Sequence, residues 1–219
     1  MNTLLLKGKP VSDALRIDLK SRIDELLLAG IIPKLAAIII GDDPASKIYV
    51  RNKSRAFKKL NSRSQTYNLS ADNTEQDILD LIDKLNHDID VHGILVQLPL
   101  PRNMDSQKIL HSVLPEKDVD GFHPYNLGSL LGGRPKFIPC TPNGILEILK
   151  YYDIPVAGRH AVIVGRSNIV GKPMFALLVQ KLEMGNATVT ICHTGTKDLS
   201  KHTRQADILI AAAGFPEMI

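Results

Sequence analysis

Two short apolar runs, separated by segments of helical pattern, restrict the fold of this chain more than any other feature. They are residues 34–41 (KLAAIIIG) and 93–98 (GILVQL). Near-continuous apolar strands that alternate with helices are typical of a parallel sheet with both faces covered. The sequence therefore predicts an α/β fold.

The remaining elements of the first part continue this alternation. Helices are expected at residues 10–29, 44–60 and 74–86, and a weaker strand at 64–69. Residues 100–139 are rich in proline and glycine and poorly periodic. A stretch of this length without clear elements is usually functional.

The second part repeats the alternation on a smaller scale. Thr141 is predicted to cap a linking helix, with Pro142 in its first position. Strands are expected at 160–164, 187–192 and 206–213, and helices at 170–182 and 201–205. This order predicts a Rossmann-like nucleotide-binding domain at 141–219, after a catalytic α/β domain at 1–140. Because a doubly wound domain needs further strands, the second domain is expected to be incomplete.

Composition narrows the classes of function. The net charge is +4, but the densest basic segment, residues 51–59, has helical spacing, which is typical of a solvated face rather than of a nucleic-acid site. The two cysteines have no CxxC spacing, so no zinc site or other metal site is predicted and a reducing cytosol fits best. No signal peptide or membrane span is predicted.

Lys53 interrupts an apolar helical stripe. At helical spacing it shares a face with Tyr49, Ala56, Phe57 and Leu60. One interpretation is a snorkelling lysine whose amine reaches water. The other is a pocket lysine, whose pKa burial would lower until it could act as an acid or base. Tyr49, one turn away, could then stack on a planar ligand.

Two further segments carry polar candidates. Gln97 lies at the carboxyl end of a buried strand, where open α/β sheets bind ligands. It could be a satisfied core amide, but Pro99 and Pro101 break the strand at once and favour a crevice. Asp118 and Asp120 lie in the loop PEKDVDGFHP, and loop aspartates are most often turn formers.

The segment HAVIVGRSNIVGKP has the order strand, turn, helix. Gly165 would end the strand, and Gly171 would allow close packing of the helix. The helix N-terminus near Ile169 would offer N–H groups to a phosphate. The spacing departs from the usual dinucleotide fingerprint, so a structural turn alone remains an alternative.

The end of the next strand bears on cofactor choice. NAD-binding units place an acidic residue there for the ribose 2′-hydroxyl. This chain has Cys192, His193 and Thr194 instead, and Arg166 stands in the first loop. Both features favour a 2′-phosphate, and hence NADP over NAD. His193 could equally be a surface histidine.

Six motifs together resemble one enzyme family. They are YVRNK, GILVQLPLP, PEKDVDGFHP, PCTPNG, GRSNIVGKP and ADILIAAAG. Their order and spacing resemble those of the bifunctional methylenetetrahydrofolate dehydrogenase/methenyltetrahydrofolate cyclohydrolases, across essentially the whole chain. The resemblance implies NADP-dependent oxidation of 5,10-methylenetetrahydrofolate and hydrolysis of the product to 10-formyltetrahydrofolate. It places the chain in one-carbon metabolism, which supplies purine, methionine and histidine biosynthesis.

The resemblance also implies roles for single residues. Lys53 would relay protons in the hydrolysis, with Gln97 holding its amine. Tyr49 would stack on the folate, and Asp120 would bind the pterin. The cofactor-binding residues would be Gly165, Arg166, Ser167 and Thr194. A homodimer and a cleft between the domains are expected as well.

Two other interpretations stay open. The chain could be a non-catalytic nucleotide-binding fragment of the same fold, or a dehydrogenase of another small metabolite. The second does not require a lysine on the Tyr49 helix together with VQLPLP. The family's sequences continue beyond ADILIAAAG, so the chain is expected to lack a C-terminal segment that borders both ligands.

Overall fold

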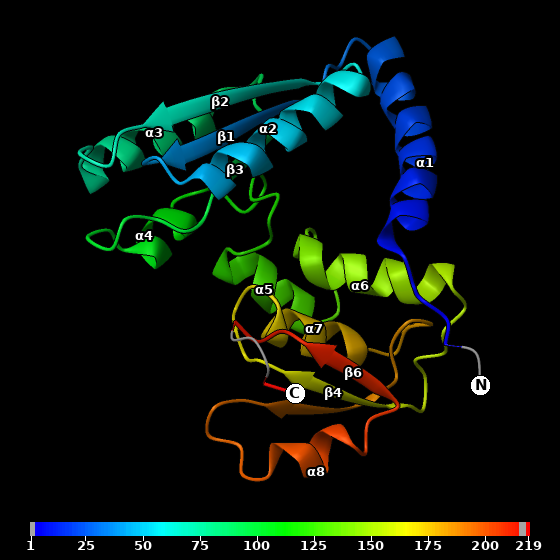
Figure 1. The fold of residues 1–219 in the computed structure, drawn as a ribbon. Coiled ribbons are helices and arrows are strands. Elements are labelled where there is room, and N and C mark those ends of the chain that lie inside the picture. The colour runs from blue at the N-terminus through cyan, green and yellow to red at the C-terminus, as the bar shows by residue number, and fades with distance from the viewer. Residues whose placement is uncertain (1–2, 215–217) are drawn as a thin grey trace. The chain divides into compact units, whose positions relative to one another are not determined.

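Parallel sheets covered by helices form the described residues, 3–214 and 218–219, of this computed structural model (Figure 1). The chain separates into two compact units. The first unit comprises residues 12–124, and the second comprises residues 1–11 and 125–219. The predicted α/β class, with a parallel sheet in each of two domains, is confirmed.

The sheet of the first unit has the strand order β2-β1-β3, with all neighbours parallel. Its strands are β1 (Lys34–Ile40), β2 (Arg63–Leu69) and β3 (Gly93–Val96). The central strand β1 is buried from Leu35 onward, as its unbroken apolar run predicts. Parallel order places the carboxyl ends of all three strands at one edge of the sheet.

Helices cover both faces of this sheet. They are α2 (Pro44–Lys59), α3 (Glu75–His87) and α4 (Ser106–His111). The α1 helix (Gly8–Leu28) precedes β1, and its first residues belong to the second unit. Val50 and Phe57 of α2 pack on Ala37 and Ile39 of β1. The α3 and α4 helices pack on the opposite face, in a core around Ile38. The apolar side chains of the first of these cores fix α2, and therefore Lys53, over the sheet.

The second unit repeats the plan with strand order β5-β4-β6, again parallel. Its strands are β4 (His160–Val164), β5 (Thr188–Cys192) and β6 (Ile208–Ala211), and its helices are α5 (Pro124–Leu131), α6 (Cys140–Tyr151), α7 (Gly171–Leu178) and α8 (Leu199–Thr203). The α5, α6 and α7 helices share one core with β4, and Leu199 of α8 packs on the other face. This is the predicted nucleotide-binding plan.

Some local predictions were wrong. Two helices, α4 and α5, lie within the predicted irregular stretch. The α4 helix begins after Asp105, whose carboxylate accepts the N–H groups of Gln107 and Lys108. The α6 helix begins at Cys140, because extended Pro139 occupies the cap position predicted for Thr141. Pro142 is thus the third helical residue and still lies in the first turn, where a missing N–H costs no hydrogen bond.

The units divide at Pro124, whereas the sequence prediction ends the first domain at residue 140. Between these positions, α5 packs in the core of the second unit through Leu130, and Gln180 donates to the Leu130 carbonyl at 2.6 Å. Within the described ranges, none of the helices combines the length and the apolar content that a membrane crossing needs.

Candidate active site

Lys53 and Tyr49 lie one turn apart on α2, as their spacing predicts. The Lys53 Nζ is 4.6 Å from the centroid of the Tyr49 ring, within the range of a cation–π contact. Lys53 is half-buried, whereas 56% of the Tyr49 surface is exposed. The Tyr49 ring therefore helps to hold the Lys53 amine in place, and its exposed surface can still contact a flat ligand.

Asp120 joins this pair from the loop that follows α4. Burial raises the pKa of the Asp120 carboxyl, the positive charge of Lys53 opposes this effect, and the negative charge of Asp118 adds to it. The structure thus brings Lys53 of α2, which lies over Tyr49, near Asp120 of a distant loop. A cation, an aromatic ring and a carboxylate in one place can bind a planar heterocycle that carries N–H groups.

Gln97 directly follows β3 and is half-buried. Its backbone N–H donates to the Ile38 carbonyl at 2.9 Å and extends the sheet by one residue. Its side-chain amide donates to the neighbouring Leu98 carbonyl at 2.8 Å. Among the hydrogen bonds of the described residues, none joins Gln97 to Lys53. The glutamine is at the ligand-binding edge of the sheet, with its carbonyl oxygen available.

The loop around Asp120 is hydrogen-bonded to the sheet through residues that the sequence did not single out. Ile94 of β3 donates its N–H to the Lys117 carbonyl at 2.7 Å. The Lys117 amine in turn donates to the Leu85 and Asp88 carbonyls at the end of α3. Asp118 is buried and accepts the His123 N–H at 2.8 Å, which confirms its predicted turn-forming role.

The loop after β4 in the second unit is shaped by two glycines. Gly165 has a φ of +129°, and a Cβ added there would lie 2.3 Å from the Ala212 carbonyl oxygen. A Cβ on Gly171 would lie 2.1 Å from the Gly165 carbonyl oxygen. Only glycine fits at either position, so α7 begins in direct backbone contact with the end of β4. This confirms the close packing predicted for Gly171.

Between these glycines, the backbone is arranged to receive an anion. The Ser167 hydroxyl accepts the Val170 N–H at 3.1 Å and so holds the turn just before α7. In the described part of the chain, no hydrogen bond uses the backbone N–H groups of residues 166–169. Arg166 and Ser167 are exposed. The loop therefore fits a phosphate group, with free N–H donors, a helix N-terminus and one guanidinium.

Thr194 lies in the turn after β5, at the same edge of the sheet. His193 donates its N–H to the Thr196 hydroxyl at 2.8 Å, and Gly195 donates its N–H to Nδ1 of His193 at 3.0 Å. The turn is therefore held by its own residues, and the exposed Thr194 is left to face a ligand. Thr196 has a structural role that the sequence did not reveal.

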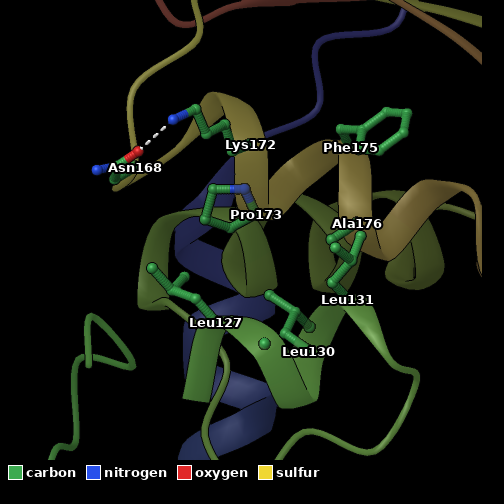
Figure 2. A pocket seen from close by; sticks show the side chains of 9 residues that line it. Leu127, Leu130, Leu131, Asn168, Lys172, Pro173, Phe175 and Ala176 are labelled. Carbon is green, nitrogen blue, oxygen red and sulfur yellow. Dashed lines mark hydrogen bonds between the residues drawn. The ribbon is translucent and has the colours of Figure 1, made fainter. Parts of the chain in front are cut away.

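A separate pocket of about 400 Å³ lies between α5 and α7. Figure 2 shows its apolar floor, formed by Leu127, Leu130 and Leu131, with Pro173 and Ala176 above. At its rim, the Lys172 amine donates to the Asn168 side chain at 2.7 Å. None of the predicted site residues lines it.

Together these features define a two-domain α/β enzyme whose second domain binds a phosphate-bearing dinucleotide. Residues 6–120 match the model of the tetrahydrofolate dehydrogenase/cyclohydrolase catalytic domain, and residues 139–219 match the NAD(P)-binding domain of the same family. The chain belongs to this family. The family predicted from the sequence motifs is confirmed, and with it the enzyme class.

Known relatives agree with this assignment. The bifunctional protein FolD of Prosthecochloris aestuarii is 52% identical over 99% of this chain and 74% of that protein. The crystal structure of the Campylobacter jejuni FolD enzyme has a TM-score of 0.91 at 48% identity and covers 96% of this chain and 74% of that one. The Trypanosoma brucei dehydrogenase-cyclohydrolase, solved with NADP cofactor and inhibitor, has a TM-score of 0.91 at 32% identity, covering 99% and 74%.

Proposed function

We propose that this chain oxidises 5,10-methylenetetrahydrofolate with NADP and hydrolyses the resulting methenyl cation to 10-formyltetrahydrofolate. The observation that carries this proposal is the Lys53 amine held over the Tyr49 ring, with its charge acting on Asp120. Family membership and the names of the similar proteins, which are methylenetetrahydrofolate dehydrogenases and cyclohydrolases, support the same substrate.

The first unit binds the folate in this proposal. Asp120, when ionised, accepts hydrogen bonds from the amino and ring N–H groups of the pterin, which a carboxylate does well. Tyr49 stacks its exposed ring on the folate. Lys53 lies beside both residues, so its amine reaches the atoms around the methylene bridge.

Lys53 carries the proton transfers of the hydrolysis. A water molecule adds to the methenyl carbon and loses a proton, and the C–N bond to one folate nitrogen then breaks as that nitrogen gains a proton. An amine at this position can relay such protons. Once folate is bound, the side-chain carbonyl oxygen of Gln97, at the end of β3, accepts a hydrogen bond from this amine and orients it.

The second unit binds NADP. The free N–H groups of Arg166 and Ser167 surround the pyrophosphate, Gly165 lets the backbone approach it closely, and Arg166 and Thr194 bind the 2′-phosphate. NADP supplies a nicotinamide ring that accepts a hydride from the methylene carbon. The residues directly at the end of β5, Cys192, His193 and Thr194, include no acid, which favours NADP over NAD, and a relative has been solved with NADP. The chain acts as a homodimer in the cytosol, where two cysteines without CxxC spacing fit the reducing environment.

An absorbance assay tests this proposal directly. The purified chain is mixed with 5,10-methylenetetrahydrofolate and NADP, and the methenyl absorbance is followed. We expect the signal to rise as the substrate is oxidised and then to decay faster than without enzyme as the product is hydrolysed. NAD in place of NADP should give a slower rise. A chain that binds NADP but never produces methenyl absorbance would instead be the non-catalytic nucleotide-binding protein.

A further inference from the structure

We propose that Asp118 is the positioning residue for the pterin-binding carboxylate, Asp120. This inference rests on the proposed function, because it assumes that Asp120 binds folate. Asp118 itself is 95% buried, since only 5% of its surface is exposed. It therefore acts on the substrate through Asp120 rather than by contact.

Asp118 closes the turn that holds Asp120. Its backbone carbonyl accepts the Gly121 N–H at 3.1 Å, and its carboxylate accepts the His123 N–H at 2.8 Å. Both donors follow Asp120 in the chain, so Asp118 fixes the backbone segment directly after Asp120. Gly121 has a φ of +69°, a left-handed conformation that suits this tight reversal.

The residues of this turn that precede Asp120 are anchored on the sheet. Asp118 pairs with Ile94 in an isolated parallel bridge, and its N–H donates to the Leu114 carbonyl at 3.0 Å. A Cβ on Gly93 would lie 2.4 Å from Val119, so the loop rests directly on β3. Val119 also packs in the core that holds Val50 of α2. Asp118 thereby sets the place of Asp120 relative to the helix that carries Lys53.

Charge gives Asp118 a second effect on Asp120. Burial and the negative charge of Asp118 raise the pKa of Asp120, and Lys53 on α2 opposes them. The other titratable groups at this loop are Glu116, Lys117 and His123, together with His111 of α4. The ring centroids of His123 and His111 lie 6.0 Å apart. Removing the Asp118 charge should therefore lower the pKa of Asp120 and keep it ionised to lower pH.

Two substitutions separate these effects. Asp118→Asn keeps an oxygen that can accept the His123 N–H but removes the charge, whereas Asp118→Ala removes both. We expect Asp118→Ala to weaken tetrahydrofolate binding by about tenfold or more, the scale of a lost charge-assisted hydrogen bond. Asp118→Asn should stay within about threefold of the wild type, since it retains the acceptor. NADP affinity should not change in either variant.

The measurement is calorimetric titration of each folded variant with tetrahydrofolate and with NADP, alongside melting temperatures. Asp90→Ala, an exposed aspartate at the other edge of the same sheet, is the control. Wild-type affinity in Asp118→Ala, or equal losses in the Ala and Asn variants, would overturn the inference. If Asp118→Ala does not fold, the pH dependence of tetrahydrofolate binding by Asp118→Asn decides. The affinity of this variant should persist to lower pH than that of the wild type. If both proteins lose affinity at the same acidic pH, the assignment is wrong.

Failure of the proposed function is distinguishable from failure of this inference. A wild-type chain that does not bind tetrahydrofolate would refute both. A wild type that binds it, an Asp120→Ala variant that does not, and an Asp118→Ala variant that binds normally would leave the proposed function intact and refute the role of Asp118 alone.

Discussion

At the scale of single residues, the candidate site depends on one carboxyl, that of Asp120, held where its charge is disfavoured. Asp120 is a half-buried carboxyl whose pKa is raised, mainly because burial disfavours its charge. The positive charge of the nearby Lys53 lowers this pKa but only partly offsets the effect of burial. A carboxylate kept in such a place costs stability, which is the pattern expected where binding, rather than folding, selects the residue.

Asp120→Asn should therefore stabilise the fold at neutral pH. A carboxyl whose pKa is raised in the folded state stabilises it when protonated and costs stability as the pH rises through that pKa. Asparagine resembles the protonated form, so the gain in Tm should be present at pH 7 and vanish below the ordinary carboxyl pKa of 3.8. For a chain of this size, each kcal/mol raises Tm by about 2–4 °C. Thermal melts from pH 3 to 8 measure the difference, and a variant that melts lower than the wild type at pH 7 would contradict the burial argument.

Arg166 should determine cofactor choice. Arg166→Ala removes the guanidinium proposed to bind the 2′-phosphate, a group that NAD lacks. A charge-assisted hydrogen bond contributes about 1.5–3 kcal/mol, so the NADP Kd should rise by about tenfold or more while the NAD Kd changes little. Titration with both cofactors checks this, with Arg159→Ala, an exposed arginine at the opposite edge of the sheet, as the control. Equal losses for NADP and NAD would mean that Arg166 only shapes the loop.

At the scale of elements, most strands and helices were predictable because the apolar period changes from strand to helix at each boundary. The strands β1 and β4 are buried almost throughout, as their apolar runs require. The prediction missed α4 and α5, because turn-forming residues interrupt the apolar periodicity of these two short helices. The Asp105 cap was the one local signal for α4. Pairings between distant segments, such as Asp118 with Ile94, have no local signature and needed the structure.

Gly171→Ala tests the contact between β4 and α7. The new Cβ would lie 2.1 Å from the Gly165 carbonyl oxygen and 2.9 Å from Arg166 Cα, both backbone atoms that cannot rotate away. We expect α7 to shift, a cost of about 1–3 kcal/mol in stability, and loss of NADP binding. Gly144→Ala in α6 has nothing within 4 Å and should be neutral or stabilising by about 0.5–1 kcal/mol.

Melting temperatures and NADP titrations of both variants provide the comparison. Tetrahydrofolate affinity should be unchanged in both, because the folate residues lie in the first unit. A Gly171→Ala chain that binds NADP as tightly as the wild type would show that the close approach is not required.

At the scale of the whole molecule, one plan occurs twice and serves two ligands. Each unit has a three-stranded parallel sheet in the described residues. In each unit some of the proposed ligand residues follow strands: Gln97 follows β3, and Gly165 and Thr194 follow β4 and β5. Sequence reasoning could place Gln97, Gly165 and Thr194 at these edges, because parallel strands end on the same side. It could not place Asp120 beside Lys53, since a loop and a helix far apart in sequence meet there only through tertiary packing.

The central claim is that Lys53 carries the proton transfers on bound folate, and hydrolysis of 5,10-methenyltetrahydrofolate tests it most directly. The decay of methenyl absorbance is compared for the wild type and Lys53→Met, which keeps the length of the side chain and removes the amine. General acid–base catalysis typically contributes about 10²–10⁴-fold, so the variant should lose that factor in rate while it folds and binds tetrahydrofolate. A Lys53→Met chain that hydrolyses the substrate at the wild-type rate would contradict the claim.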